Sequence, residues 1–367
     1  MRFRHLAVVL LGAGLAAHGA LSRRPLCVVP QAGQPPSGAA DWTRAAVLGP
    51  FVRNDGAGMP AAGTLARICR TADALCLRVE CQEPQMAALR AGVTQRDGMV
   101  WVDDCVEVFV QAPGQRAYAH FVVNPLGTAF DELVRDSSWN AAWECAAGRG
   151  EGSWWCELRI PFAALGGAPG KDADWGLNVC RSRRPEPELS AWSATGAGFH
   201  QPERLGTVRF ADQPWPTAVT WSWPSRRDVA AVLTWRPEGV GANLQVTING
   251  TPADKPVRLE REGTVPLWLE ARLGQTPVYR ACFVADITPM SGALQAARAA
   301  LQGLPEAEVA ALTARLGALE ALRDQAGPAL AADIAAQARE LELRASRLKL
   351  RAEIGRASCR ERVWTVV

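Results

Sequence analysis

The residues best suited to chemistry lie between positions 101 and 109, where the run WVDDCVEVF alternates apolar and polar side chains. Side chains of a strand point alternately to its two faces, so the pattern predicts a strand with Trp101, Glu107 and Phe109 on one face and Val106 and Val108 on the other. A flat aromatic ring beside carboxylates suits a sugar ring, whose apolar face stacks and whose hydroxyl groups form hydrogen bonds. The same run also fits a tryptophan at the edge of the core with acids facing solvent.

The elements around this run indicate a mainly β protein. Residues 37–211 contain short alternating segments separated by Gly, Pro and Asp, such as residues 74–80 and 118–124. Such a series is typical of all-β folds, and we predict a β-sandwich of jelly-roll or immunoglobulin-like type over residues 37–211. Residues 217–287 are also β-rich, with Asn249-Gly250 as a hairpin turn, and we interpret them as a small immunoglobulin-like domain.

The composition turns to Ala, Leu, Glu and Arg after residue 291. Apolar residues then recur at helical spacing, as in Val309, Leu312 and Leu316. Pro305 begins one predicted helix. We therefore predict a helical hairpin or coiled segment over residues 291–352.

The first residues predict export. Residues 1–20 resemble a secretory signal peptide, with Arg2 and Arg4 before an apolar run and Ala17-His18-Gly19 at the cleavage site. The apolar run is shorter than the ~20 residues of a membrane span. We therefore predict no transmembrane span and a secreted, periplasmic or cell-surface protein. A formal net charge of +3, with no basic run, argues against a nucleic acid as partner.

The sequence contains ten cysteines, which in an exported protein favour disulfides. Several lie inside predicted strands, where reduced and buried thiols are an equally good interpretation. Cys145 and Cys156 flank a glycine-rich turn and are the candidates for a disulfide across a hairpin. The sequence has neither a CxxC pair nor a Cys/His cluster, so zinc is not expected.

An ordered series of motifs carries a resemblance to a known family. The motifs are ADWTRA (40–45), WVDDCVEVF (101–109), AHFVVNPLG (119–127), WCELRIPF (155–162), WGLNVCR (175–181), SAWS (190–193) and FHQPERLG (199–206). Together they resemble the family 9 carbohydrate-binding module and its relatives among DOMON-like β-sandwich domains, over roughly half of the chain. The resemblance implies an exported, non-catalytic domain of polysaccharide catabolism whose partner is a poly- or oligosaccharide.

The resemblance also implies roles for single residues. In that family two aromatic side chains clamp a terminal sugar, and polar residues on adjacent strands bind its hydroxyl groups. Trp101 and Phe199 correspond to the clamp, and Glu107 and Asn124 to polar positions. The predicted sugar-binding residues are Trp101, Glu107, Asn124, Phe199, Trp192, Asn178 and Arg181.

The chain departs from the family at two positions. Val122 and Cys180 stand where the family has an arginine and a glutamine. Each lost hydrogen bond removes about 0.5–1.5 kcal/mol of binding. Arg181, Trp192 and His200 are the neighbouring residues able to compensate, and the ligand need not be that of the best-known members.

Cofactors and catalysis stay open at this point. Asp103 and Asp104 are candidate calcium ligands, with Asp131 and Glu132 as further oxygens. Calcium takes about six to eight oxygens, however, and no EF-hand-like loop supplies them, so exposed acids are the default interpretation and structural calcium stays an open alternative. The sequence contains no GxSxG, phosphate-loop or HExxH motif. A carboxylate pair for glycoside hydrolysis needs only a separation of about 5–9.5 Å in space, so an enzyme is neither predicted nor excluded.

Two alternatives to a simple binding protein remain. Residues 353–363 resemble a translated sequencing adapter, and we interpret residues 353–367 as an artefact. The chain would then be the N-terminal binding region of a truncated glycoside hydrolase, whose catalytic domain is the lost partner. The second alternative is a haem-binding DOMON-like redox domain. Its ligands would be His120 and one methionine among Met59, Met86 and Met99.

Overall fold

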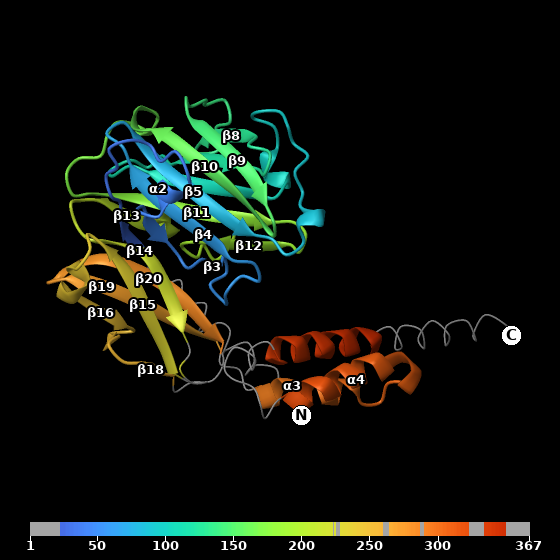
Figure 1. Ribbon diagram of the computed structural model, residues 1–367. Helices are drawn as coiled ribbons and strands as arrows, with labels where there is room; N and C mark the ends of the chain where they lie inside the picture. Colours follow the sequence, from blue (N-terminus) through green and yellow to red (C-terminus); the bar gives the residue numbers. More distant parts are fainter. Residues whose placement is uncertain are drawn as a thin grey trace, which may run out of the picture. The chain divides into compact units, whose positions relative to one another are not determined.

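The computed structural model describes residues 23–222, 224, 228–259, 264–286, 290–322 and 334–349. These residues form two compact units: the first holds residues up to 221 with 231–257 and 266–285, and the second holds 222–230, 258–265 and residues from 286 onward (Figure 1). The predicted signal peptide and the predicted artefact lie outside the described residues.

One layer of the first unit is a five-stranded antiparallel sheet. In spatial order its strands are β2 (Ala46–Leu48), β4 (Thr64–Arg70), β5 (Ala74–Gln82), β10 (Ser153–Pro161) and β9 (Glu144–Gly150). Buried and partly exposed side chains alternate along the whole of β10. This alternation is expected where one face of an antiparallel sheet packs on the core and the other meets water.

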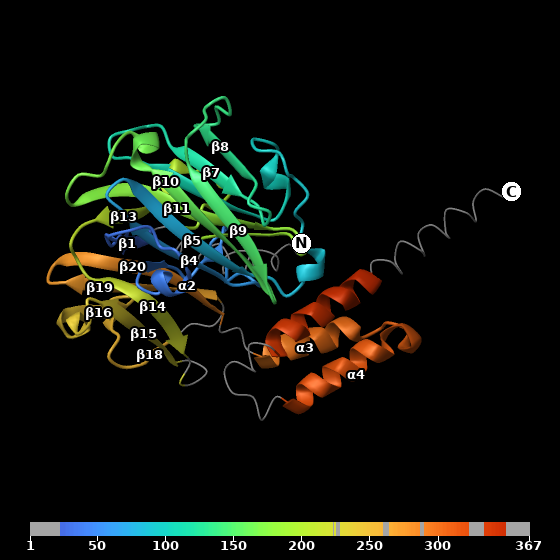
Figure 2. The same ribbon diagram turned by 45° about the horizontal axis from the view of Figure 1, so that its top comes forward.

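The second layer belongs to a larger sheet. Its strands in spatial order are β17 (Thr251–Pro252), β16 (Leu244–Ile248), β19 (Thr264–Leu273), β20 (Thr276–Asp286), β1 (Leu26–Val28), β13 (Gly206–Phe210), β11 (Ala173–Arg183), β6 (Cys105–Gln111), β7 (Ala119–Val123) and β8 (Ala129–Leu133), while β12 (Glu188–Ala191) pairs with β11 and with β3 (Val52–Arg53). Strands β7 and β8 form one end of this sheet (Figure 2). The face of β6 that packs on the core carries Val106, Val108 and Val110, which are all buried.

Strand β1 joins the sandwich to the later strands. Cys27 lies opposite Val208 of β13 in a parallel pair and opposite Tyr279 of β20 in an antiparallel pair. Strands β16, β17, β19 and β20 therefore continue the large sheet. A separate three-stranded sheet contains β14 (Trp215–Ser222), β15 (Asp228–Arg236) and β18 (Val257–Arg258). The division into domains at residues 211 and 217 stays a prediction.

Most of the described α-helices lie in the second unit. The first unit holds α2 (Ala39–Trp42), and the second holds α3 (Met290–Leu301), α4 (Glu306–Leu322) and a helix over residues 334–349. The second unit thus has three helical segments where a hairpin was predicted. The additional helix is α3, which ends at Leu301. Gly303, with a φ of +78°, lies just beyond this end and separates α3 from α4.

The three helical segments pack around one apolar core of alanine and leucine with Val309 and Ile334. Among the described helices, none is both long and apolar enough to cross a membrane. The prediction of a mainly β chain, with a sandwich, further strands and C-terminal helices, is confirmed.

Candidate functional site

A cavity of about 570 Å³ opens on the outer face of the large sheet, the face turned away from the five-stranded layer. Strands contribute Glu107, His120, Phe130, Glu132, Ser182 and Leu189 to its lining, and loops contribute Trp101, Arg135, Arg184, Gly198, Phe199 and His200. Aromatic rings and ionisable groups therefore share one open pocket.

The strand register explains why the polar side chains meet. Phe109 of β6 lies opposite His120 of β7, and His120 lies opposite Glu132 of β8. Directly paired residues of an antiparallel sheet point to the same face. Glu107 is two residues from Phe109 and therefore shares this face as well.

A chain of hydrogen bonds crosses the floor of the cavity. Nε2 of His120 lies 3.0 Å from Oε2 of Glu107, and Nδ1 lies 3.0 Å from Oε1 of Glu132. His200 comes from a loop: its Nε2 lies 3.7 Å from the same Glu132 oxygen, and its Nδ1 lies 3.0 Å from the hydroxyl of Tyr118.

These contacts set the charge of the site. Burial by itself lowers the pKa of His120, but the hydrogen bonds with Glu107 and Glu132 outweigh it and raise that pKa above its usual value. The hydrogen bond from His120 lowers the pKa of Glu132. Burial, followed by the nearby positive charges of His120 and Arg135, lowers the pKa of His200 to about 4. His200 is therefore neutral at pH 7.

Aromatic packing holds the two imidazoles in place. The ring of Phe109 stacks on that of His120 with centroids 4.2 Å apart and planes at 8°. The edge contact between Phe109 and His200 has a centroid distance of 5.1 Å at 84°. Trp101 packs its ring edge-to-face on Phe130 at 4.9 Å and remains 39% exposed at the mouth of the cavity.

The segment that carries Trp101 is not the strand expected from the sequence. Val100–Val102 form a 3-10 helix, Val102 is exposed, and β6 begins only at Cys105. The carboxylate of Asp103 accepts hydrogen bonds from the amides of Gly92 and Val93, which holds the chain out of the sheet. Arg184 donates to the carbonyl of Trp101, so the ring is fixed by a loop and not by strand register.

A comparison with known families bears on this pocket. Residues 59–141 match the model described as Carbohydrate-binding family 9. The match includes six of the residues that line the cavity: Trp101, Glu107, His120, Phe130, Glu132 and Arg135. The resemblance to family 9 seen in the sequence is confirmed over this segment. No curated protein matches the chain.

Solved structures show low similarity. A candidate carbohydrate-binding protein from Bacteroides uniformis is 22% identical, with a TM-score of 0.43 over 51% of this chain and 100% of the other. A family 9 module from Caldicellulosiruptor kristjanssonii in complex with cellotriose is 14% identical, with a TM-score of 0.40 over 51% and 94%. The same module in complex with glucose gives 14% identity and a TM-score of 0.37 over 50% and 95%. Similarity at this level supports no conclusion about the ligand of this chain.

Three of the residues predicted from the family 9 resemblance come together in the cavity. Trp101, Glu107 and Phe199 all contribute to the lining. Phe199 is only 6% exposed, because it packs with Phe109 and Leu205. Trp101 therefore offers the free aromatic surface, and Phe199 offers a wall.

Two predicted asparagines are buried and organise loops. The side-chain amide of Asn124 donates to the carbonyl of Val93 and to Asp103, and its oxygen accepts from the amides of Leu126 and Thr128. Asn178 donates to the carbonyl of Ser193 and accepts from its amide. Neither residue lines the cavity, so both act on the site through the loops they hold.

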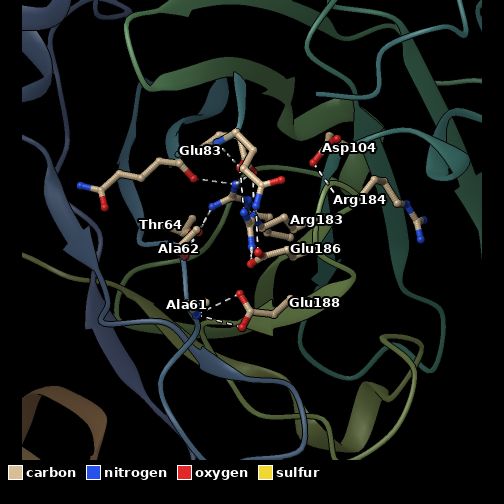
Figure 3. A network of polar contacts seen from close by, with 12 residues as sticks. Ala61, Ala62, Thr64, Glu83, Asp104, Arg183, Arg184, Glu186 and Glu188 are labelled. Carbon is tan, nitrogen blue, oxygen red and sulfur yellow. Dashed lines mark hydrogen bonds and ion pairs between the residues drawn. The ribbon is translucent and has the colours of Figure 1, made fainter. Parts of the chain in front are cut away.

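The last two predicted sugar-binding residues are also buried. Trp192 packs so closely on Gly206 that a Cβ there would lie 2.5 Å from the ring. Arg181 points to the inner face, where it donates to the carbonyl of Gln82 at 2.7 Å. It lies opposite Val106, which explains its direction, and its guanidinium lies 3.4 Å from the buried Glu83. Figure 3 shows Glu83 with Arg183 in this network of polar contacts.

The carboxylates predicted as calcium ligands serve the backbone. Asp103 accepts from Gly92, Val93 and Asn124, as described above. Asp104 accepts from the amides of Arg90 and Arg184. The bonds engage both oxygens of Asp104 but only Oδ2 of Asp103, and a role in calcium binding stays untested.

The haem alternative finds little support in this geometry. Both nitrogens of His120 face carboxylates. None of Met59, Met86 and Met99 is among the described residues that line the cavity. The sulfur of Met59 accepts from the amide of Val284 elsewhere in the unit.

The predicted disulfide between Cys145 and Cys156 is absent, and both thiols are free. The register pairs Cys145 with Leu158 and Cys156 with Ala147. The two cysteines are therefore diagonal neighbours in the β9–β10 hairpin and not directly opposed. Burial raises the pKa of both thiols.

The sequence did not single out the centre of the site. From the sequence, His120 is a candidate ligand for haem and Glu132 a candidate ligand for calcium, and nothing predicts that the two residues meet. The alternation of apolar and polar residues over 118–124 does predict that His120 and Phe121 point to opposite faces of a strand. It does not predict which strands pair or in what register.

Proposed function

We propose that this chain binds a carbohydrate in the cavity above Glu107, His120 and Glu132, with a sugar ring stacked on Trp101. The observation that carries the proposal is the exposed Trp101 ring at the mouth of a pocket whose floor is a row of buried, oriented polar groups. The family 9 match over residues 59–141 supports the same function.

The chemistry of the pocket suits a polyhydroxylated ligand. The apolar face of a pyranose gains contact area on an indole, and the rim hydroxyls donate to carboxylates or accept from guanidinium groups. Glu107 and Glu132 supply acceptors, and Arg184 and Arg135 supply donors at the edge of the cavity. Its volume of about 570 Å³ lies in the range of small-ligand pockets.

We also propose that the binding is non-catalytic. Glu107 and Glu132 both hydrogen-bond to the same imidazole, an arrangement that keeps them as acceptors. With the signal-like residues 1–20, this supports an exported protein that recruits a polysaccharide. Holding substrate near a glycoside hydrolase raises its local concentration, and a hydrolase is the partner that this function would serve, on a separate chain or on the same one.

Titration calorimetry with glucose, cellotriose and a wider set of oligosaccharides tests the proposal. The wild-type chain should bind at least one of them, and Trp101→Ala should lose most of the affinity. Trp155→Ala is the matched control, because Trp155 is a partly exposed tryptophan of β10 in the other layer, covered by Arg78 at 4.5 Å. Equal losses in both variants, or no loss in Trp101→Ala, would show that the pocket is not the binding site.

A further inference from the structure

We propose that His120, Glu132 and His200 form a binding site for a divalent transition-metal ion of the zinc class at the floor of the cavity. One ligand atom from each of the three residues lies within 4.8 Å of the other two. This site does not depend on sugar binding, and it goes beyond the carbohydrate function proposed above.

The ligand set determines the class of ion. Two imidazoles and one carboxylate suit zinc, copper, nickel or cobalt, whereas calcium prefers a shell of oxygens. Bonds of about 2.0–2.2 Å to zinc place neighbouring ligand atoms roughly 3–3.5 Å apart. The Glu132 oxygen lies 3.0 Å from Nδ1 of His120 and 3.7 Å from Nε2 of His200. The three ligand atoms lie within 4.8 Å of one another, so the partly buried His200 has to move toward the other two residues to complete the site.

The outer contacts are those of a metal site. Histidine ligands usually donate their second ring nitrogen to a carboxylate or another acceptor, which fixes the tautomer and the ring orientation. His120 has Glu107 at its second nitrogen, and His200 has Tyr118, each at 3.0 Å. Phe109 packs on both rings and holds them beside Glu132 in the absence of an ion.

A proton is the competing occupant. The position between Nδ1 of His120 and Oε1 of Glu132 holds a hydrogen in the hydrogen-bonded state, and an ion that binds both atoms displaces it. Nε2 of His200 is available as a ligand atom when its Nδ1–H donates to the Tyr118 oxygen. All three residues line the open cavity, so a fourth coordination position faces solvent or a ligand.

Cobalt titration of the full chain tests the site. Protein freed of metal with a chelator should take up one equivalent of Co²⁺, followed by its visible absorption, and Zn²⁺ should displace it. His200→Gln and Glu132→Gln should abolish stoichiometric uptake. Tyr118→Phe should weaken it by the roughly 10–100-fold typical of a lost outer contact. Glu144→Gln, an exposed carboxylate of β9, is the control and should bind as the wild type does.

Several outcomes would overturn the proposal. These are no uptake by the wild-type chain, unchanged uptake in both ligand variants, or sulfur-to-cobalt bands that assign the ion to one of the free cysteines. If a variant fails to fold, NMR of the histidine side chains in the wild type decides, because Zn²⁺ must shift the signals of His120 and His200. Trp101→Ala should keep metal uptake while it loses sugar affinity, so failure of one function is distinguishable from failure of the other.

Discussion

Nε2 of His120 lies 3.0 Å from the carboxylate of Glu107, although the two residues are 13 positions apart. The turn between β6 and β7 pairs Glu107 with Val122 and Phe109 with His120, so Glu107 and His120 are diagonal neighbours on the outer face. The imidazole thus orients one carboxylate oxygen, and the other stays near Ser182 and Cys105 at the edge of the cavity.

Glu107→Gln should weaken sugar binding without loss of the fold. A hydrogen bond to a charged group contributes about 1.5–3 kcal/mol, so affinity should fall by roughly 10–100-fold. Calorimetry with the best-binding oligosaccharide measures the loss. Glu151→Gln, an exposed turn carboxylate between β9 and β10, should bind like the wild type. A Glu107→Gln variant with unchanged affinity would remove Glu107 from the sugar site.

Trp101→Ala and Phe199→Ala should separate binding from stability. Trp101 is 39% exposed and Phe199 is 6% exposed. Truncation of a buried aromatic side chain costs about 3–5 kcal/mol of unfolding free energy, and Trp101→Ala should cost less than this. In binding, loss of the stacked ring should cost about 1–3 kcal/mol. Urea unfolding and calorimetry on both variants check the contrast; a larger stability loss for Trp101→Ala would mean that its ring is a core element.

Glu83→Gln should be strongly destabilising. Both oxygens of the buried Glu83 accept from Arg183, at 2.7 and 2.8 Å (Figure 3). Arg181 lies 3.4 Å from the same carboxylate. Removal of the negative charge takes away the buried counter-charge of Arg181 and Arg183, which costs about 3–5 kcal/mol. Glu186→Gln is the matched control, because Glu186 pairs with the same Arg183 but is mostly exposed, and it should cost no more than about 1 kcal/mol. Equal unfolding free energies for the two variants would contradict this.

The same pair gives a pH dependence. Burial opposes ionisation of Glu83, but the hydrogen bonds from Arg183 and the Gln85 amide, with the arginine charges, hold its pKa below the usual value. Because the pKa of Glu83 is lower in the folded chain, the unfolded chain takes up the proton at a higher pH. The contribution of ionised Glu83 to the unfolding free energy is therefore complete above the unfolded pKa of about 4.3, and it is lost as pH falls through the lower folded pKa. The difference in unfolding free energy between wild type and Glu83→Gln should therefore be constant near pH 7 and shrink below about pH 4. A difference that stays constant into acid would exclude Glu83 as the group responsible.

Gly206→Ala should destabilise the sandwich through Trp192. An added Cβ would lie 2.5 Å from the Trp192 ring, which is buried and has no free side to move to. Overpacking of this kind costs about 1–3 kcal/mol. Gly170→Ala, where a Cβ meets nothing within 4 Å, is the control and should be near neutral. Unfolding in urea compares the two, and equal midpoints would show that the ring relocates freely.

Local patterns were enough to predict the strands and one face of the site. The alternation in residues 105–109 places Glu107 and Phe109 on one face and Val106 and Val108 on the other, because strand side chains repeat every second residue. The ordered motifs were enough for the family resemblance, since they are properties of the chain and not of its contacts. The start of α4 directly after Pro305 was predictable for a similar local reason, because proline favours the first turn of a helix.

Long-range pairing decided the rest. His120, Glu132 and His200 are separated by up to 80 positions and meet only because β7 pairs with β8 in one register and the loop after β12 folds over them. The strand begins at Cys105 and not at Trp101, because the side chain of Asp103 binds backbone amides ten and eleven residues away, a contact that no periodicity encodes. Arg181 points inward because its partner is Val106, and strand partners are chosen by the packing of the whole sandwich. The alternation of side chains within a strand is a local property. Which face of the strand joins the core, and which residues lie opposite it, depends on how the sheets assemble.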